Sequence, residues 1–107
     1  MDWKEISQIR KNGDYLRARE LARTELQKTP NSLQLKSQIE WTYYSEIKEI
    51  TTKLKQADPV DHRLVQQLIK TYEDYIKGET RRPEMAFSMI LQLICPYSTQ
   101  LPDFYNL

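Results

Sequence analysis

Residues that interrupt helices are scarce in this chain and stand far apart. Its 107 residues include two glycines, Gly13 and Gly78, and five prolines that fall singly at positions 30, 59, 83, 96 and 102. Glycine alone usually makes up about 7% of a globular protein, because many turns need its backbone freedom. Long helices separated by a few sharp breaks satisfy this composition, so we expect an all-α fold.

Between the breaks, apolar residues recur at steps of three and four residues, which is the period of an α-helix. We predict helices over residues 3–12, 15–28, 32–57, 60–77 and 83–95, with residues 101–107 as the start of another. The longest helix carries its apolar stripe on Leu35, Ile39, Tyr43, Ile47, Ile50 and Leu54. The 83–95 helix is apolar nearly all round, which is typical of a helix buried from several sides, and Pro96 is expected to end it.

The segment from Asn12 to Asp14 predicts a tight reversal of the chain. Gly13 can adopt the left-handed conformation that commonly ends a helix, and the Asp14 carboxylate can accept N–H bonds from the next helix start. Pro30 then ends the second helix, and Ser32 is a good N-cap for the third. Because such links are short, we expect consecutive helices to be antiparallel.

One segment contains, at fixed spacings, residues that suit a turn, a helix N-cap, a close contact between two helices and the end of a helix. These residues are Gly13, Asp14, Tyr15, Ala18, Leu26, Pro30 and Asn31. The segment resembles a tetratricopeptide repeat, a helix hairpin of about 34 residues. The resemblance covers roughly residues 2–32, with a weaker second start at Leu33. It implies antiparallel helix hairpins stacked as a short solenoid or bundle.

The expected organisation is a single helical domain over residues 1–107. It divides into a repeat-like hairpin (2–31), a long helix with an antiparallel partner (32–77), and an apolar helix with a C-terminal segment (83–107). Because the chain stops where another helix begins, we expect a fragment of a longer protein or a domain completed by another subunit. The layout is also similar to the N-terminal helical region of large bacterial conflict and phage-defence proteins.

Residues for catalysis or metal binding are nearly missing from the sequence. His62 is the only histidine and Cys95 the only cysteine, so zinc sites and Cys–His pairs lack partners. We expect His62 at the surface, Cys95 as a buried thiol, and Glu46 and Glu49 as solvated charges on a helix face. With no glycine-rich phosphate loop either, we expect no cofactor, no metal and no enzymatic activity.

The charge balance argues against a polyanionic partner. Sixteen basic and fifteen acidic residues leave a net charge of +1. One interpretation of a basic cluster is a nucleic-acid-binding surface; the cluster consists of Arg10, Lys11, Arg17, Arg19 and Arg23. Helical periodicity points Arg17 and Arg19 in different directions, so nucleic acid is an unfavoured partner. No stretch approaches the ~20 apolar residues of a membrane span, and we expect a cytoplasmic location.

The favoured function is non-catalytic protein–protein interaction, with a groove offered to a peptide or partner protein. In tetratricopeptide repeats the first helix of each hairpin forms the inner, ligand-facing side. The resemblance therefore assigns the partner-binding residues to Ser7, Arg10, Lys11, Gln34, Ser37, Gln38, Trp41 and Tyr44. Two alternatives stay open: self-association through the C-terminal apolar region, and a nucleic-acid-associated domain of a larger defence protein. Trp41 and Tyr44 can also be interpreted as packing against the following helix.

Overall fold

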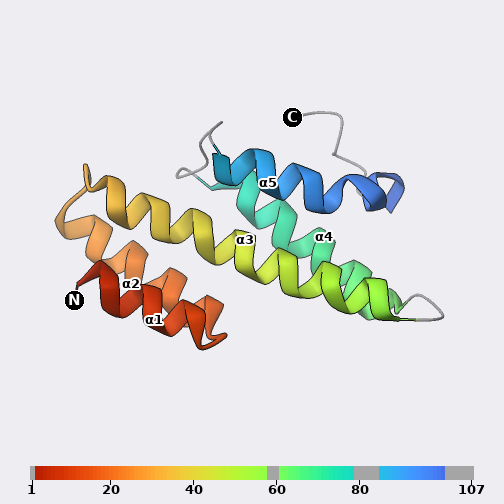
Figure 1. Cartoon of the computed structure of the whole chain (residues 1–107). Helices are drawn as coiled ribbons and strands as arrows, with labels where there is room; N and C mark the ends of the chain where they lie inside the picture. The colour runs from red at the N-terminus through yellow and green to blue at the C-terminus, as the bar shows by residue number, and fades with distance from the viewer. Residues whose placement is uncertain (1, 58–60, 79–84, 101–107) are drawn as a thin grey trace.

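In the computed structural model, residues 2–57, 61–78 and 85–100 are described, with side chains from 88 to 97 in the last range. These residues contain no strand, and the predicted all-α class is confirmed (Figure 1). The elements are α1 (Trp3–Lys11), α2 (Tyr15–Lys28), α3 (Leu33–Gln56), α4 (His62–Lys77), α5 (Met85–Ile94) and the 3-10 helix η1 (Cys95–Gln100).

The reversal between α1 and α2 forms as predicted. Gly13 has φ +91°, a conformation that residues with a side chain rarely adopt. The Gly13 N–H donates to the Arg10 carbonyl at 2.9 Å, and the Asp14 N–H donates to the Ile9 carbonyl at 3.2 Å. The Asp14 carboxylate accepts from the Arg17 N–H at 3.4 Å and so caps α2. The chain therefore turns back within three residues.

The next two helices also begin at side-chain caps. Ser32 Oγ accepts from the Leu35 N–H at 3.3 Å at the start of α3. Asp61 Oδ1 accepts from the Arg63 N–H at 2.9 Å at the start of α4. Such caps satisfy N–H groups that have no partner within the helix itself. Short polar links therefore separate the first four helices.

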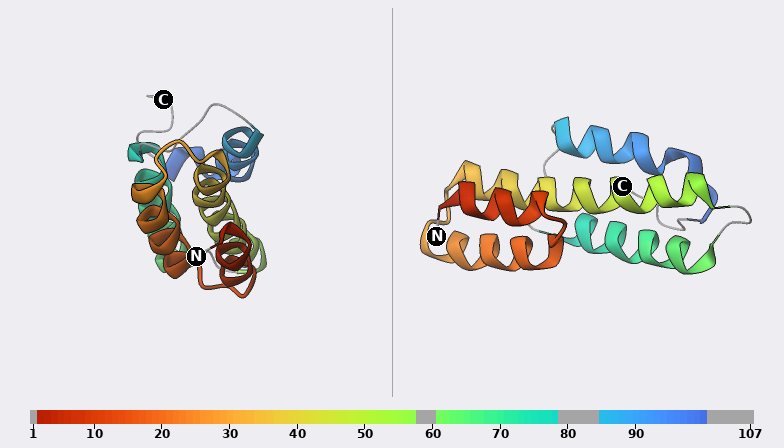
Figure 2. Two further views of the ribbon diagram at one scale, coloured as in Figure 1. Left: turned by 90° about the vertical axis from the view of Figure 1, so that its left-hand side faces the viewer. Right: turned by 60° about the horizontal axis from the view of Figure 1, so that its bottom comes forward.

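The long helix α3 is the centre of the molecule, and the other four α-helices pack against it. Its 24 residues span about 36 Å at 1.5 Å per residue, most of the molecule's 44 Å length. Viewed along α3, helices α1, α3 and α5 lie on one side and α2 and α4 on the other (Figure 2). Helices α2 and α4 follow one another end to end along α3, and both run antiparallel to it (Figures 1 and 2).

The core follows the stripe that the sequence predicts for α3. All six stripe residues, Leu35, Ile39, Tyr43, Ile47, Ile50 and Leu54, are buried. Small residues of α2, Ala18 and Ala22, are fully covered and let α2 approach α3 closely. Helix α4 adds an apolar side that includes Leu68 and Tyr72. One continuous core therefore runs along α3.

The prediction that α5 is buried from several sides is wrong for the side chains described. Ile90 and Ile94 are buried, whereas Leu91 and Leu93 are half-buried and Gln92 is exposed. The physical reason is that, among the described elements, α5 packs mainly against α3 and η1. Among the described residues, no helix therefore covers the side of α5 that faces away from α3.

At the end of α5, one expectation is wrong and another is confirmed. Cys95 is exposed, because it lies at the junction of α5 and η1 rather than on the side that faces α3. The α-helix ends at Ile94, one residue before the predicted end at Cys95, and the chain continues through Pro96 as the 3-10 helix η1. A proline in the first turn of a helix removes no hydrogen bond, because N–H groups there have no partner within the helix. His62, by contrast, is exposed as predicted.

Some predictions fall outside the described residues. They concern the turn at Pro59, the connector 79–83 and the segment 101–107. Within the described part of the chain, no helix combines the length and the apolar character that crossing a membrane requires.

Candidate functional site

The predicted partner-binding residues come from α1 and α3, and the structure brings these two helices together. The Arg10 guanidinium donates to Ser45 Oγ of α3 at 3.0 Å and to Ser7 Oγ of its own helix at 3.4 Å. Arg10 is half-buried, and Lys11 beside it is exposed. The last turn of α1 is thus tied to the middle of α3. We call this surface the α1–α3 face.

Two aromatic side chains dominate the α3 part of this face. Trp41 and Tyr44 are half-buried, with ring centroids 5.3 Å apart and ring planes at 86°, an edge-to-face contact. Tyr44 packs against the core, and the Lys48 ammonium lies 5.8 Å from the centre of its ring. Trp41 therefore rests on an anchored ring while part of its own surface stays open.

The remaining predicted residues divide between surface and interior. Gln34 is exposed and Ser37 is half-buried, so both are accessible. Ser7 and Gln38 are only 8% and 7% exposed, which places them in the packing of α1 against α3. Six of the eight residues are thus accessible at the surface: Arg10, Lys11, Gln34, Ser37, Trp41 and Tyr44.

A second polar group lies where α2, α3 and α4 meet, and it includes Glu46, which the sequence predicted to be solvated. Arg19 is 5% exposed and forms an ion pair with Glu46 at 2.8 Å. Its Nε donates to Thr42 Oγ1 at 3.1 Å, and the guanidinium carbon lies 3.7 Å from the centre of the Tyr43 ring. Thr71 of α4 donates to the other Glu46 oxygen at 3.1 Å. We call these five residues the Arg19 cluster.

The Arg19 cluster corrects one prediction and agrees with another. Glu46, whose side chain is 19% exposed, is not a fully solvated charge. Arg19 is buried in an ion pair, in agreement with the expectation that the five basic residues do not form one basic surface. Helical spacing held a signal for this, because Arg19 stands three residues before Ala22 and seven before Leu26, on the apolar side of α2. The partner residues on α3 and α4 had no comparable signal.

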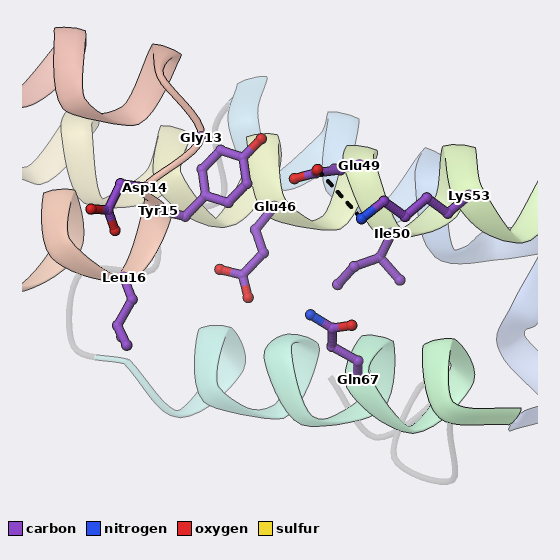
Figure 3. A pocket seen from close by; sticks show the side chains of 9 residues that line it. All are labelled: Gly13, Asp14, Tyr15, Leu16, Glu46, Glu49, Ile50, Lys53 and Gln67. Carbon is purple, nitrogen blue, oxygen red and sulfur yellow. Dashed lines mark ion pairs between the residues drawn. The ribbon is translucent and has the colours of Figure 1, made fainter.

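Next to this cluster a notch of about 300 Å³ opens between the start of α2, the middle of α3 and α4. Its lining includes Gly13, Asp14, Tyr15, Leu16, Glu46, Glu49, Ile50, Lys53 and Gln67. In Figure 3, Glu46 points from α3 into the gap between α2 and α4, and Gln67 points toward α3. Lys53 pairs with Glu49 at 3.5 Å. The carboxylates Glu46 and Glu49 are thus already engaged within the protein.

The pKa of Tyr15, which lines this notch, is shifted in the direction that makes the phenol less reactive. Burial raises the pKa of the Tyr15 phenol, and a hydrogen bond and charge repulsion from Glu49 raise it further. A phenol with a raised pKa stays neutral near pH 7 and is a poor base or nucleophile. Burial also lowers the pKa of the Arg10 guanidinium, which nevertheless stays cationic near pH 7.

No family model matches the chain, and no curated protein and no solved structure is significantly similar to it. Among the described residues, no group of three or more histidine, cysteine or acidic side chains is arranged to hold a metal ion. The surface instead offers groups suited to non-covalent binding, namely the half-buried Trp41 and Tyr44 rings with Lys48 beside Tyr44.

Proposed function

We propose that this protein is a non-catalytic protein-interaction module that binds a peptide or partner protein on the α1–α3 face. The observation that carries the proposal is the Trp41–Tyr44 pair, which combines a firmly packed ring with a partly open one. Tryptophan, tyrosine and arginine dominate the energetics of protein interfaces, because they bury a large area and keep a polar end. Arg10, held by Ser45, stands on the same face.

Several features of the face suit recognition. The Arg10 hydrogen bonds and the Tyr44 packing fix these side chains before binding, so less conformational entropy is lost when a partner docks. Gln34 and Ser37 add hydrogen-bonding groups along the same helix. The tetratricopeptide-like character of residues 2–31 belongs to this proposal, and the Gly13 reversal that pairs α1 with α2 supports it. A cytoplasmic location is part of it too.

Peptide selection tests the proposal directly. Random displayed peptides would be selected against the full chain, and binding would be followed by fluorescence in a Trp3→Phe variant, where Trp41 is the only tryptophan. We expect an emission change on binding, and a loss of affinity of about tenfold or more for Trp41→Ala. Thr52→Ala, an exposed change farther along α3, serves as the control. Peptides that bind both variants equally would contradict the proposal.

Self-association is a second candidate, favoured by the half-buried Met89, Leu91 and Leu93 on a helix that packs mainly on α3. Light scattering over a range of concentrations decides this, since a constant monomer mass would remove it. The nucleic-acid alternative has fewer cations than the sequence suggested, because Arg19 is buried in an ion pair. Affinity for DNA or RNA that falls steeply with salt would revive it.

A further inference from the structure

A basic groove lies along the second half of α2, beside the C-terminal end of α4. Its cavity measures about 630 Å³, and Pro30 and Gly78 border it at the ends of α2 and α4. Three cations from three helices surround it: Arg23 of α2, Lys36 of α3 and Lys77 of α4. The cavity has the size of a typical ligand site. We call it the Arg23 groove.

The cations of the Arg23 groove are not neutralised by the described residues. Neither Lys36 nor Lys77 forms an ion pair within the described part of the chain. Arg23 donates to the Tyr43 hydroxyl at 2.7 Å. This acceptor is neutral, so it orients the guanidinium without neutralising its positive charge. The described lining includes no carboxylate; Asp74 lines an adjoining cavity that shares Arg23 and Lys77 with the groove, and it forms no ion pair with either. An anionic ligand is the complement of this groove.

The rest of the lining indicates which kind of anion fits. Leu26 and Pro30 provide apolar surface between the cations, and Gln27 provides an amide. No aromatic ring is among the described lining residues, so bases of a single-stranded nucleic acid would find no stacking platform there. Asp74 and Glu73 follow one another on α4 close to Lys77, which interrupts any long basic track for a phosphate backbone.

We propose that the Arg23 groove binds an acidic segment of a partner protein, in which Asp or Glu residues flank an apolar side chain. The carboxylates would pair with Arg23, Lys36 and Lys77, and the apolar side chain would cover Leu26 and Pro30. Because Tyr43 already orients Arg23, this side chain loses less conformational entropy on binding a carboxylate than a freely rotating arginine would. This site is distinct from the α1–α3 face, and the two proposals stand or fall separately.

Fluorescence anisotropy with a labelled peptide of alternating glutamate and leucine tests the groove, using the full chain. The test variant is Lys36→Gln with Lys77→Gln. The matched control is Lys55→Gln with Lys70→Gln, which removes one exposed lysine from each of the same two helices and changes the net charge equally. We expect the test variant to lose affinity by about fivefold to tenfold, and the control by less than about twofold. Binding should weaken with salt.

Three results would overturn the proposal. Equal losses in the test and control variants would mean that net charge alone attracts the peptide. Equal binding of a peptide with glutamine in place of glutamate would mean that the carboxylates are not recognised. An oligothymidylate that binds more tightly than the peptide and depends on Lys36 and Lys77 would assign the groove to nucleic acid. A circular dichroism melt of both variants would confirm that each is folded.

Discussion

At the scale of single residues, Arg19 differs most from what its type suggests. Arginine is usually exposed, yet this side chain is 5% exposed and meets Glu46, Thr42 and the Tyr43 ring. A buried guanidinium is tolerated when its charge is paired and its N–H groups have acceptors, and this arrangement supplies both. The Arg19 cluster therefore joins α2 to α3 through Arg19, and α4 to α3 through the Thr71–Glu46 hydrogen bond.

Replacing Arg19 should be costly. In Arg19→Met the aliphatic stem remains, but Glu46 loses its cation in a partly desolvated place. We expect the free energy of unfolding to fall by about 2–3 kcal/mol, below the range for fully buried pairs because Glu46 keeps some water contact. Urea denaturation measures this. Arg17→Met, an exposed change on the same helix, should stay within about 0.5 kcal/mol. Similar losses in the two variants would contradict the role given to Arg19.

Tyr15 predicts a pH dependence at the alkaline end. Burial, followed by Glu49, raises its pKa in the folded state, so the fold favours the neutral phenol. This contribution is complete below the unfolded-state pKa of about 10 and is lost as the pH rises through the folded-state value. Between about pH 9 and 11, the unfolding free energy should fall less steeply for Tyr15→Phe than for the wild type. Urea denaturation across this range measures the slopes.

Glu49→Gln separates the two causes of the Tyr15 shift. Removing the negative charge leaves burial in place, so the alkaline slope of this variant should lie between those of the wild type and Tyr15→Phe. If the unfolding free energy falls equally steeply with pH in the wild type and in Tyr15→Phe, the folded protein does not raise the pKa of the Tyr15 phenol.

At the scale of elements, the reversal at Gly13 decides how α1 lies on α2 and α3. The φ of +91° strains any residue with a side chain, although a Cβ at Gly13 would meet no atom within 4 Å. We therefore expect Gly13→Ala to lower the unfolding free energy by about 1 kcal/mol, from backbone strain alone. Thermal or urea unfolding measures it.

Gly78 offers a matched control for Gly13. Its φ of −71° and ψ of 141° suit any residue, so Gly78→Ala should leave stability equal or slightly higher. A Gly13→Ala variant as stable as Gly78→Ala would mean that the turn relaxes without strain, and that the placement of α1 is less firmly determined than the structure indicates.

At the scale of the whole molecule, stability should decrease from the centre of α3 toward α1. Helix α3 has ten buried residues and contacts with every other α-helix, whereas α1 is nine residues long and buries two, Ile6 and Ser7. Hydrogen exchange should therefore be slowest around Tyr43 to Ile50 and faster in α1, because local opening of α1 exposes little apolar surface. Mass spectrometry of peptides from the exchanged protein measures this difference in exchange rate between α1 and α3. Equal protection of α1 and α3 would mean that they open only together.

Local rules were enough for the helices, their caps, the Gly13 reversal and the α3 stripe. Each depends on residues within about one turn of one another, where helical geometry is the same in any protein. From Tyr15 to Lys28, the predicted helix agrees with the observed one residue for residue. For the candidate site, the repeat resemblance predicted that α1 and α3 share one face; the Arg10–Ser45 hydrogen bond shows that the two helices are in contact, and partner binding there stays a prediction.

Tertiary packing decided what local rules cannot reach. The Arg19–Glu46 pair joins residues 27 positions apart, and it exists only because α2 packs against α3. The same packing buries Ser7 and Gln38, leaves Cys95 exposed and brings Arg23, Lys36 and Lys77 around one groove. The period of a helix tells which residues share a side. Only the neighbouring helices determine whether that side is covered, since burial depends on atoms far away in the sequence.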